Sequence, residues 1–216
     1  MTATLHVAIP LFPRFTALDA IGPYEVLQRI PSIRITFVGH QPGEVRSDNR
    51  MLGLVVDATF EEVPQPDVIV FPGGVGTRAL EHDDRVLEWL RRAHATTRYT
   101  TSVCTGSLVL AAAGLLDALT ATTHWACYGE LEALGAVPVA ERVVEHLDRR
   151  LVTAAGVSAG IDMALRLVEL LVDRTGAEAA QLMIEYDPQP PFDAGSRAKG
   201  SPAVLARVSE YAARRS

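Results

Sequence analysis

The sequence predicts a single-domain α/β fold, a parallel sheet sandwiched between helices on both of its faces. Short β-rich runs alternate with helical runs, which is the pattern of parallel strands joined by helical crossovers. Residues 67–71 form a nearly continuous β-branched run, typical of a strand buried on both faces. The chain has 216 residues and is 48% hydrophobic, so it can build one substantial core.

The first half of the chain begins with an apolar strand at residues 5–9, which prolines end. Residues 16–29 follow as a helix, with Gly22-Pro23 expected near its start or at a break. A second strand covers residues 33–38, where apolar and other residues alternate, and residues 52–60 form a further extended segment.

The central elements surround the buried strand at 67–71. Residues 83–95 carry apolar side chains at helical spacing and charges elsewhere. A short strand at 99–103 runs directly into an alanine- and leucine-rich helix at 105–114, which Gly114 ends. Two short strands, at 142–146 and 150–154, are connected by a turn.

The last part of the chain is mainly helical. Residues 158–174 show the most regular helical spacing in the sequence, and Gly176 ends that helix. Residues 177–186 continue as helix, the proline-containing segment 187–200 is a loop, and residues 202–214 form a closing helix. We therefore expect one domain over residues 1–216.

Charge and targeting signals exclude several classes of protein. The chain carries 20 Lys and Arg against 26 Asp and Glu, a net charge of −6, and lacks a basic block. This argues against nucleic-acid binding. No signal peptide or transit peptide is visible, and every apolar run is shorter than the roughly 18 residues of a membrane span. We expect a soluble cytoplasmic protein, without a membrane partner, whose two cysteines stay reduced.

Functional residues are expected where strands end. In open α/β sheets the site lies beyond the carboxyl ends of the strands. This rule selects the loops at residues 12–19, 72–77 and 103–105. The residues with chemical potential fall in these three loops.

Cys104 stands between a strand and a helix, the order of a nucleophile elbow, and Gly106 allows the helix to approach the sheet closely. A thiol at a helix N-terminus is expected to have a lowered pKa. The alternative is a small buried cysteine that only packs beneath the helix. We favour the nucleophile.

Asp19 is an acid among apolar residues just after the first strand, where burial is costly without a partner. It can be an N-cap or surface acid, or it can hydrogen-bond to the Cys104 sulfur. A carboxyl beside a thiolate keeps its proton, so Asp19 would be a general acid. Glu25 is the competing acid, two turns further along the helix.

Glycines after the buried strand can bring backbone N–H groups close to a ligand. Gly73 and Gly74 are candidate substrate-binding residues, and the Gly74 N–H could form an oxyanion hole with the N–H of Thr105. The spacing does not fit a dinucleotide-binding fingerprint. His124 is a further candidate substrate-binding residue; it is either a base that activates Cys104 or a structural histidine.

The remaining candidate groups favour structural roles. Cys127 is interpreted as a structural cysteine, and Asp162 as an acid at a helix start. The other histidines are scattered and form no metal-ligand cluster with the cysteines.

The motifs together resemble the PfpI/ThiJ superfamily, which is related to glutamine-amidotransferase domains. The matching segments are LDAIGPYEV (18–26), FPGG (71–74), CTG (104–106) and THW (123–125). Within it the chain resembles isonitrile hydratases, mainly through IEYDPQPPFDAG (184–195) and TGSLVLAAAG (105–114). The resemblance covers nearly the whole chain and implies a flavodoxin-like or amidotransferase-like fold.

The resemblance also implies a function and its residues. It implies a catalytic cysteine at Cys104, a catalytic acid at Asp19, a supporting Thr105, and a homodimer without metal or organic cofactor. The expected reaction hydrates a small isonitrile to an N-substituted formamide through a cysteine thioimidate. Thr105, where peptidase-like members have histidine, weakens a protease interpretation. The acidic chain, ending at Ser216 without a helix-turn-helix, argues against a transcription regulator.

Two alternatives remain open. One is another cysteine-dependent reaction on the same fold, a glyoxalase-like hydration or an amide hydrolysis. The other is a non-enzymatic redox or stress-response module in which Cys104 is oxidised reversibly. A small apolar substrate requires an apolar pocket, for which four residues are candidates: Phe12, Phe15, Ile21 and Trp125.

Overall fold

A computed structural model describes residues 4–213, which form two compact units, one up to Ile184 and one from Glu185 onward. The first unit contains the sheet, its covering helices and the predicted functional residues. The second unit contains a short 3-10 helix and one α-helix. The expectation of one catalytic domain over residues 1–216 stays a prediction, and its two ends lie outside the described residues.

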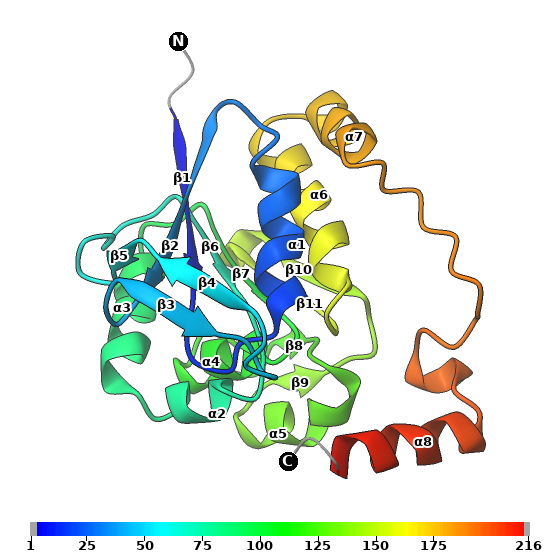
Figure 1. Cartoon of the computed structure of the whole chain (residues 1–216). Helices are drawn as coiled ribbons and strands as arrows, with labels where there is room; N and C mark the ends of the chain where they lie inside the picture. Colours follow the sequence, from blue (N-terminus) through cyan, green and yellow to red (C-terminus); the bar gives the residue numbers. More distant parts are fainter. Residues whose placement is uncertain (1–3, 214–216) are drawn as a thin grey trace. The chain divides into compact units, whose positions relative to one another are not determined.

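The first unit is built on a seven-stranded sheet with the order β10-β11-β7-β6-β1-β2-β5 (Figure 1). Its strands are β1 (Leu5–Pro10), β2 (Ile33–Gly39), β5 (Ala58–Thr59), β6 (Val68–Phe71), β7 (Tyr99–Val103), β10 (Val143–His146) and β11 (Leu151–Ala154). All neighbouring pairs are parallel except β10 and β11, which are antiparallel. The predicted α/β class is confirmed, with the correction that one edge makes the sheet mixed.

The antiparallel edge follows from the short connection between β10 and β11. Only a 3-10 turn, η2 (Leu147–Arg149), and Arg150 separate the two strands. Parallel neighbours need a crossover of a dozen or more residues, so a link this short can only reverse the chain. Arg150 completes the reversal in the left-handed region, with φ of 60°.

Helices cover both faces of the sheet, as predicted. On one face α1 (Ala17–Leu27) packs along α6 (Ala159–Leu171), and α7 (Arg174–Met183) packs on α6. The other face carries α3 (Asp84–His94) and α4 (Gly106–Ala112) (Figure 1). Among the described residues, each helix is too short or too polar to cross a bilayer.

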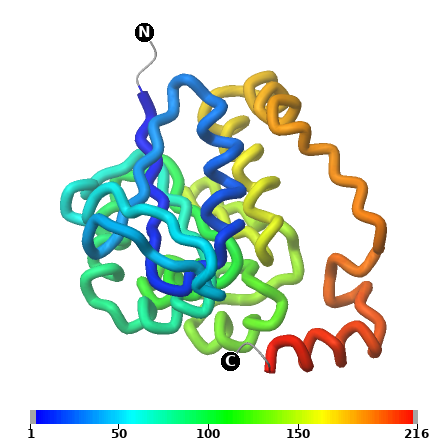
Figure 2. Tube along the Cα trace, in the orientation of Figure 1, coloured from blue at the N-terminus to red at the C-terminus, as the bar shows by residue number. Residues whose placement is uncertain are grey.

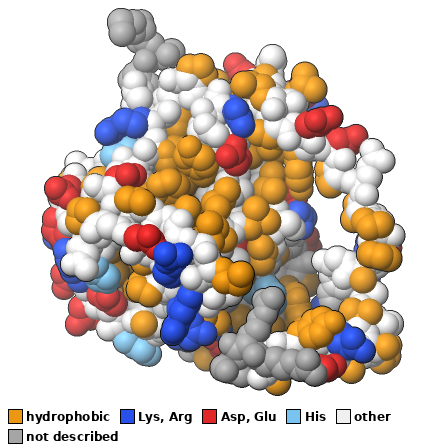
Figure 3. All heavy atoms as spheres, in the orientation of Figure 1, with side chains coloured by type: hydrophobic (Ala, Val, Ile, Leu, Met, Phe, Trp, Pro, Cys, Tyr) orange, Lys and Arg blue, Asp and Glu red, His pale blue; other side chains and the backbone are white. Residues whose placement is uncertain are grey.

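Apolar side chains gather on the surface of α1 and α6 (Figure 3). Leu18 is 40% exposed, and Ile21, Tyr24, Ile161 and Leu165 are partly exposed beside it. The homodimer implied by resemblance stays a prediction.

Several short elements were not predicted. The extended segment predicted at 52–60 is confirmed, since it contains β4 (Gly53–Val56) and β5, whereas β3 (Gly43–Arg46), which pairs with β4 in a hairpin, was not predicted. Between α4 and β10 the chain forms β8 (Thr120–Ala121), η1 (Trp125–Cys127), α5 (Tyr128–Ala133) and β9 (Val137–Pro138), and α2 (Thr77–Leu80) follows β6. Elements of two to six residues are too short for hydrophobic periodicity to show.

The predicted position of Gly22 and Pro23 in the first helix is wrong. Gly22 and Pro23 lie inside a continuous α1 and mark neither its start nor a break. Pro23 has no N–H to donate to the carbonyl of Asp19, four residues earlier, so the helix loses one hydrogen bond there. Gly22 lets α6 approach, since a Cβ at this position would lie 3.1 Å from Cγ1 of Ile161.

The second unit has little regular structure. Residues 187–196 lack helix and strand, in agreement with the predicted loop, and η3 (Arg197–Lys199) interrupts it. The closing helix α8 (Pro202–Ala213) follows, and Arg214, where we expected it to end, lies outside the described residues. Figure 2 shows this path in orange and red.

Candidate active site

The sheet topology brings the predicted site residues together. β1, β6 and β7 are parallel neighbours, so the loops that follow them meet at one edge of the sheet. Asp19 comes from the first turn of α1, Gly73 from the loop after β6, and Cys104 from the end of β7. The arrangement places an acid, a glycine loop and a thiol at the carboxyl ends of the strands, as predicted.

Cys104 has the backbone conformation of a nucleophile elbow. Its φ of 56° lies in the left-handed region, which is uncommon for a residue other than glycine. The N–H of Cys104 donates to the carbonyls of Ala154 (3.0 Å) and Ala155 (2.9 Å). Its carbonyl accepts the hydroxyl of Thr123 at 3.0 Å. These bonds on both sides of the residue hold the strained conformation in place.

Gly106 explains how α4 begins directly beneath the strand end. A Cβ on Gly106 would lie 2.2 Å from the carbonyl oxygen of Phe71, closer than atoms can approach. Only glycine therefore fits between α4 and the end of β6.

Asp19 is the buried acid of the site. Its side chain has no exposure to solvent, and its Oδ2 accepts the N–H of Gly73 at 2.9 Å. Oδ1 is also buried and lacks a hydrogen-bond partner among the described residues. Glu25, the competing acid, pairs with Arg29 at the surface. The structure therefore favours Asp19 over Glu25 as the acid of the site.

Burial raises the pKa values of both the Cys104 thiol and the Asp19 carboxyl. Burial raises the pKa of Asp19 to about 7, although bonds from the Gly73 N–H and the Cys104 thiol lower it. The charge of Asp48, on the neighbouring loop, raises it further. Near neutral pH this pair of groups can therefore gain or lose a proton.

The predicted lowering of the Cys104 pKa is wrong for the free protein. Burial raises the pKa of this thiol, and the charge of Asp19 raises it further. Hydrogen bonds from the N–H groups of Val157 and Thr105 act in the opposite direction but are outweighed. The side chain is only 5% exposed, so desolvation has the largest effect on the pKa of Cys104. The N-terminus of α4, a helix of only seven residues, does not offset it.

The glycine loop holds the site together and does not open toward a ligand. The Gly74 N–H donates to the hydroxyl oxygen of Thr105 at 2.8 Å, and this hydroxyl donates to the Gly74 carbonyl at 3.1 Å. Gly74 has φ of 132°, and a Cβ there would lie 2.5 Å from the carbonyl oxygen of Arg14. The predicted oxyanion hole therefore lacks one donor, since the Gly74 N–H is already used inside the protein.

Val157 is a site residue that the sequence analysis missed. It follows β11, adjacent to β7, and its N–H donates to the Cys104 sulfur. Its φ of 33° is strained for a β-branched residue. In this conformation the N–H points at the sulfur, whereas the predicted oxyanion hole used the N–H groups of Gly74 and Thr105.

His124 has a bonding pattern that does not include the thiol. Its Nδ1 accepts the N–H of Ala126 at 3.3 Å, and its ring packs on Gly156 and on the ring of Trp125. Among the described residues, hydrogen bonds to the Cys104 sulfur come from backbone N–H groups. A substrate-binding role for His124 stays a prediction.

Cys127 lies in a different environment. Its sulfur accepts a hydrogen bond from Nη2 of Arg78 at 3.2 Å, and the same nitrogen pairs with Glu130 at 2.6 Å. Burial raises the pKa of this thiol, and Arg78 lowers it.

Other candidate groups fall outside the site. Phe12 and Phe15 are buried in the core, and Phe12 packs against Phe71. Asp162 pairs with Arg142. Within residues 4–213, His, Cys, Asp and Glu form no group of three that could hold a metal ion.

The chain is similar to known proteins over most of its length. The model of the DJ-1/PfpI family matches residues 5–170. The chain is 45% identical to the isonitrile hydratase of Pseudomonas putida over 209 residues, which is 97% of this chain and 90% of that protein.

Two solved structures share the fold. A ThiJ/PfpI family protein from Pseudomonas syringae superposes with a TM-score of 0.91 at 39% identity, over 98% of this chain and 87% of that one. DJ-1beta of Drosophila melanogaster gives a TM-score of 0.76 at 22% identity, over 84% of this chain and 98% of that one.

Proposed function

The chain belongs to the DJ-1/PfpI family, and we propose that it is an enzyme that hydrates an isonitrile, R–N≡C, to the formamide R–NH–CHO. One observation carries the chemistry: the Cys104 thiol and the Asp19 carboxyl share a buried site in which one proton is exchangeable near neutral pH. The similarity to isonitrile hydratase supplies the class of substrate.

The first step adds sulfur and hydrogen to the terminal carbon of the isonitrile. In the form that holds one proton, the raised pKa of the thiol places this proton on Cys104, and the reaction begins when it moves to Asp19 and leaves Cys104 as a thiolate. The sulfur forms a bond to the carbon, and Asp19 donates its proton to the same carbon. The product is a thioimidate, S–CH=N–R, and Asp19 is left as a carboxylate. The unpartnered Oδ1 of Asp19 is the oxygen available for this transfer.

The second step uses water and restores the enzyme. The Asp19 carboxylate takes a proton from the water that attacks the thioimidate carbon and passes it to the nitrogen. Collapse of the tetrahedral intermediate breaks the C–S bond and returns the hydroxyl proton to Asp19. The formamide leaves with the nitrogen and carbon of the isonitrile and the oxygen of water.

Two backbone N–H groups stabilise charge on sulfur during both steps. The N–H groups of Val157 and Thr105 donate to the Cys104 sulfur. They therefore stabilise the thiolate that attacks the isonitrile, and again the thiolate that leaves when the tetrahedral intermediate collapses. Thr105 also fixes the glycine loop through its hydroxyl. We expect this chemistry to need no metal or organic cofactor and to take place in the cytoplasm.

The test is product formation from cyclohexyl isonitrile, followed by mass spectrometry in water enriched in ¹⁸O. We expect N-cyclohexylformamide carrying one ¹⁸O atom. Asp19→Asn should lower kcat by about 10²- to 10⁴-fold, the usual contribution of acid–base catalysis. Glu25→Gln, on the same helix but at the surface, is the matched control and should retain activity.

Methylglyoxal and small amides are assayed beside the isonitrile. Turnover of either without formamide production would replace the proposal by a glyoxalase-like or amidase activity. If no substrate reacts and mild peroxide converts Cys104 reversibly to a sulfenic acid, a redox module is the better description.

A further inference from the structure

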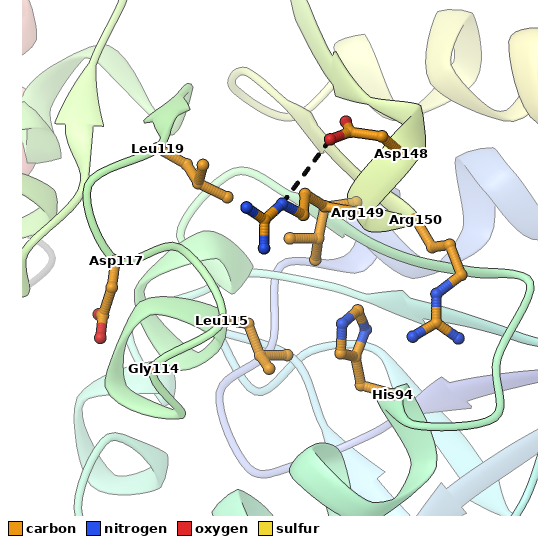
Figure 4. Close-up of a pocket in the computed structure, with 9 residues that line it drawn as sticks. His94, Gly114, Leu115, Asp117, Leu119, Asp148, Arg149 and Arg150 are labelled. Atoms are coloured by element: carbon orange, nitrogen blue, oxygen red, sulfur yellow. Dashed lines mark ion pairs between the residues drawn. The ribbon is translucent and has the colours of Figure 1, made fainter.

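A cavity of about 550 Å³ is lined by the first residue of β11 (Figure 4), whereas Cys104 follows the last residue of the neighbouring parallel strand β7. It is bounded by the C-terminus of α3, the loop between α4 and β8, and the turn between β10 and β11. Its size is in the range of pockets that hold small organic ligands. The residues of the proposed catalytic site do not line it, so it is a separate feature of the fold.

One wall of this cavity carries two guanidinium groups. Arg149 is exposed, and within residues 4–213 its ion pair is with the exposed Asp148, at 3.7 Å, an ion pair of little strength. Arg150 donates through Nη1 to the carbonyls of Ala95 and Thr97, and its other guanidinium nitrogens have no partner among the described residues. Planar guanidinium groups match the two oxygens of a carboxylate.

The acidic residues of the lining do not cancel this charge inside the cavity. Figure 4 shows Asp148 at the rim, directed at Arg149, and Asp117 turned away from the two arginines. Oδ1 and Oδ2 of Asp117 instead lie near the positions of Gly135 and Gly114.

A second wall presents a hydrogen-bond acceptor. The Thr97 hydroxyl lies 3.3 Å from the carbonyl oxygen of His94 and 2.9 Å from the Thr100 hydroxyl, which lies 3.0 Å from Nδ1 of His94. In the arrangement in which Thr97 donates to that carbonyl, Thr100 donates to Thr97 and the Nδ1–H donates to Thr100, so Nε2 is the unprotonated nitrogen. Burial and the charge of Arg150 lower the pKa of His94, so the ring stays neutral. The ring points into the cavity between Leu115 and Arg150 (Figure 4).

The rest of the lining is apolar: Leu115, Leu119 and Leu151. A bare inorganic anion would use the arginines and leave these leucine side chains without a partner. A ligand that fits all three features carries a carboxylate, one hydrogen-bond donor and an apolar body.

We propose that this cavity binds a small hydroxy acid with an apolar side chain, with its carboxylate attracted by the charges of Arg149 and Arg150 and its hydroxyl on Nε2 of His94. The proposal is independent of the chemistry at Cys104. β7 and β11 run from this cavity to the elbow, so the ligand would sit at the far ends of the strands that hold the nucleophile.

Titration calorimetry with a set of matched probes tests the proposal on the full chain. Mandelate has all three features, phenylacetate lacks the hydroxyl, mandelamide lacks the charge and lactate lacks the apolar body. We expect mandelate to bind at one site. Mandelamide, lactate and inorganic phosphate should each bind at least about tenfold more weakly than mandelate, and the affinity of phenylacetate should lie between that of mandelate and that of these three ligands.

Variants locate the binding. Arg149→Gln should weaken mandelate at least about tenfold without affecting the fold, because this side chain is exposed. His94→Phe should remove the preference for mandelate over phenylacetate. Arg174→Gln, at an exposed arginine on α7, is the control and should leave binding unchanged. The proposal is overturned if mandelate fails to saturate at about 10 mM, if phosphate binds as well as mandelate, or if Arg149→Gln binds like the wild type.

Discussion

The two cysteines of this chain are nearly equally buried, but the groups that form hydrogen bonds with each sulfur differ. Cys104 is 5% exposed and Cys127 is 7% exposed. Cys104 sits in a strained backbone conformation, beside a buried acid and two N–H groups. Cys127 sits on a 3-10 helix, beside the partly exposed ion pair of Arg78 and Glu130. Burial alone therefore does not distinguish a nucleophile from a structural thiol.

The difference teaches what a reactive thiol requires in this fold. Both thiols are desolvated, so the pKa of each is raised. Only Cys104 has a group beside it, Asp19, that can exchange a proton with it near neutral pH. The proposed mechanism relies on a proton carrier next to the sulfur rather than on a low thiol pKa in the free protein.

Replacing each cysteine is the largest test of this comparison. Cys104→Ala should lower kcat for isonitrile hydration by on the order of 10³-fold or more, because no other group can form the thioimidate. Cys127→Ala should stay within about threefold of the wild type, since its sulfur accepts its hydrogen bond from Arg78, outside the proposed catalytic residues. Formamide production followed by mass spectrometry measures both. Equal losses in the two variants would contradict the comparison.

The next test asks whether the glycine loop positions Asp19, and it compares Gly73, in that loop, with Gly129, which lies elsewhere in the chain. A Cβ at Gly73 would lie 2.5 Å from the Thr105 nitrogen and 2.8 Å from Oδ2 of Asp19, whereas a Cβ at Gly129 meets nothing within 4 Å. Gly73→Ala should cost about 1–3 kcal/mol of stability and lower kcat by about 10²-fold, because the acid is displaced.

Gly129→Ala is the matched control for this change. Gly129 lies within α5, where alanine should stabilise the helix by up to about 1 kcal/mol. Urea denaturation and the isonitrile assay are carried out on both variants. A Gly73→Ala protein with full activity would show that the glycine loop does not position Asp19.

The pH dependence of activity tests the proton shared by Cys104 and Asp19. Because the pKa of Asp19 is raised to about 7, the pair holds two protons below this pH and one proton above it. The proposed first step needs the form with one proton. We therefore expect kcat/KM to rise by about tenfold from pH 6 to pH 8, with a midpoint near pH 7. A profile that falls over this interval would contradict the proposed protonation state.

The sequence predicted much of this site because its signals are local. The order strand, cysteine, helix marks the elbow at Cys104, and the parallel topology brings Asp19 and Gly73 to the same edge. The direction of the Cys104 pKa could not be predicted, since it depends on how completely the folded chain removes water from the sulfur.

Val157 was missed because a backbone N–H leaves no mark in the sequence. Valine rarely adopts a positive φ such as the 33° of Val157, so the residue type did not predict this backbone conformation. A signal was nevertheless available. β11 is parallel to β7, so the loop that follows β11 belongs to the same edge as the other three loops.

The charge beside Cys127 provides the smallest test of the comparison. Arg78 lowers the pKa of this thiol, whereas Glu130 raises it. Arg78→Met keeps the length of the side chain and removes its charge, so the thiolate fraction of Cys127 should decrease and its alkylation by iodoacetamide at pH 8 should slow several-fold. Glu130→Gln should change the rate in the opposite direction. Peptide mass spectrometry follows both thiols in the same sample, and Cys104 serves as the internal reference. If Arg78→Met slows both thiols equally, the two sites share one electrostatic environment and the distinction between them fails.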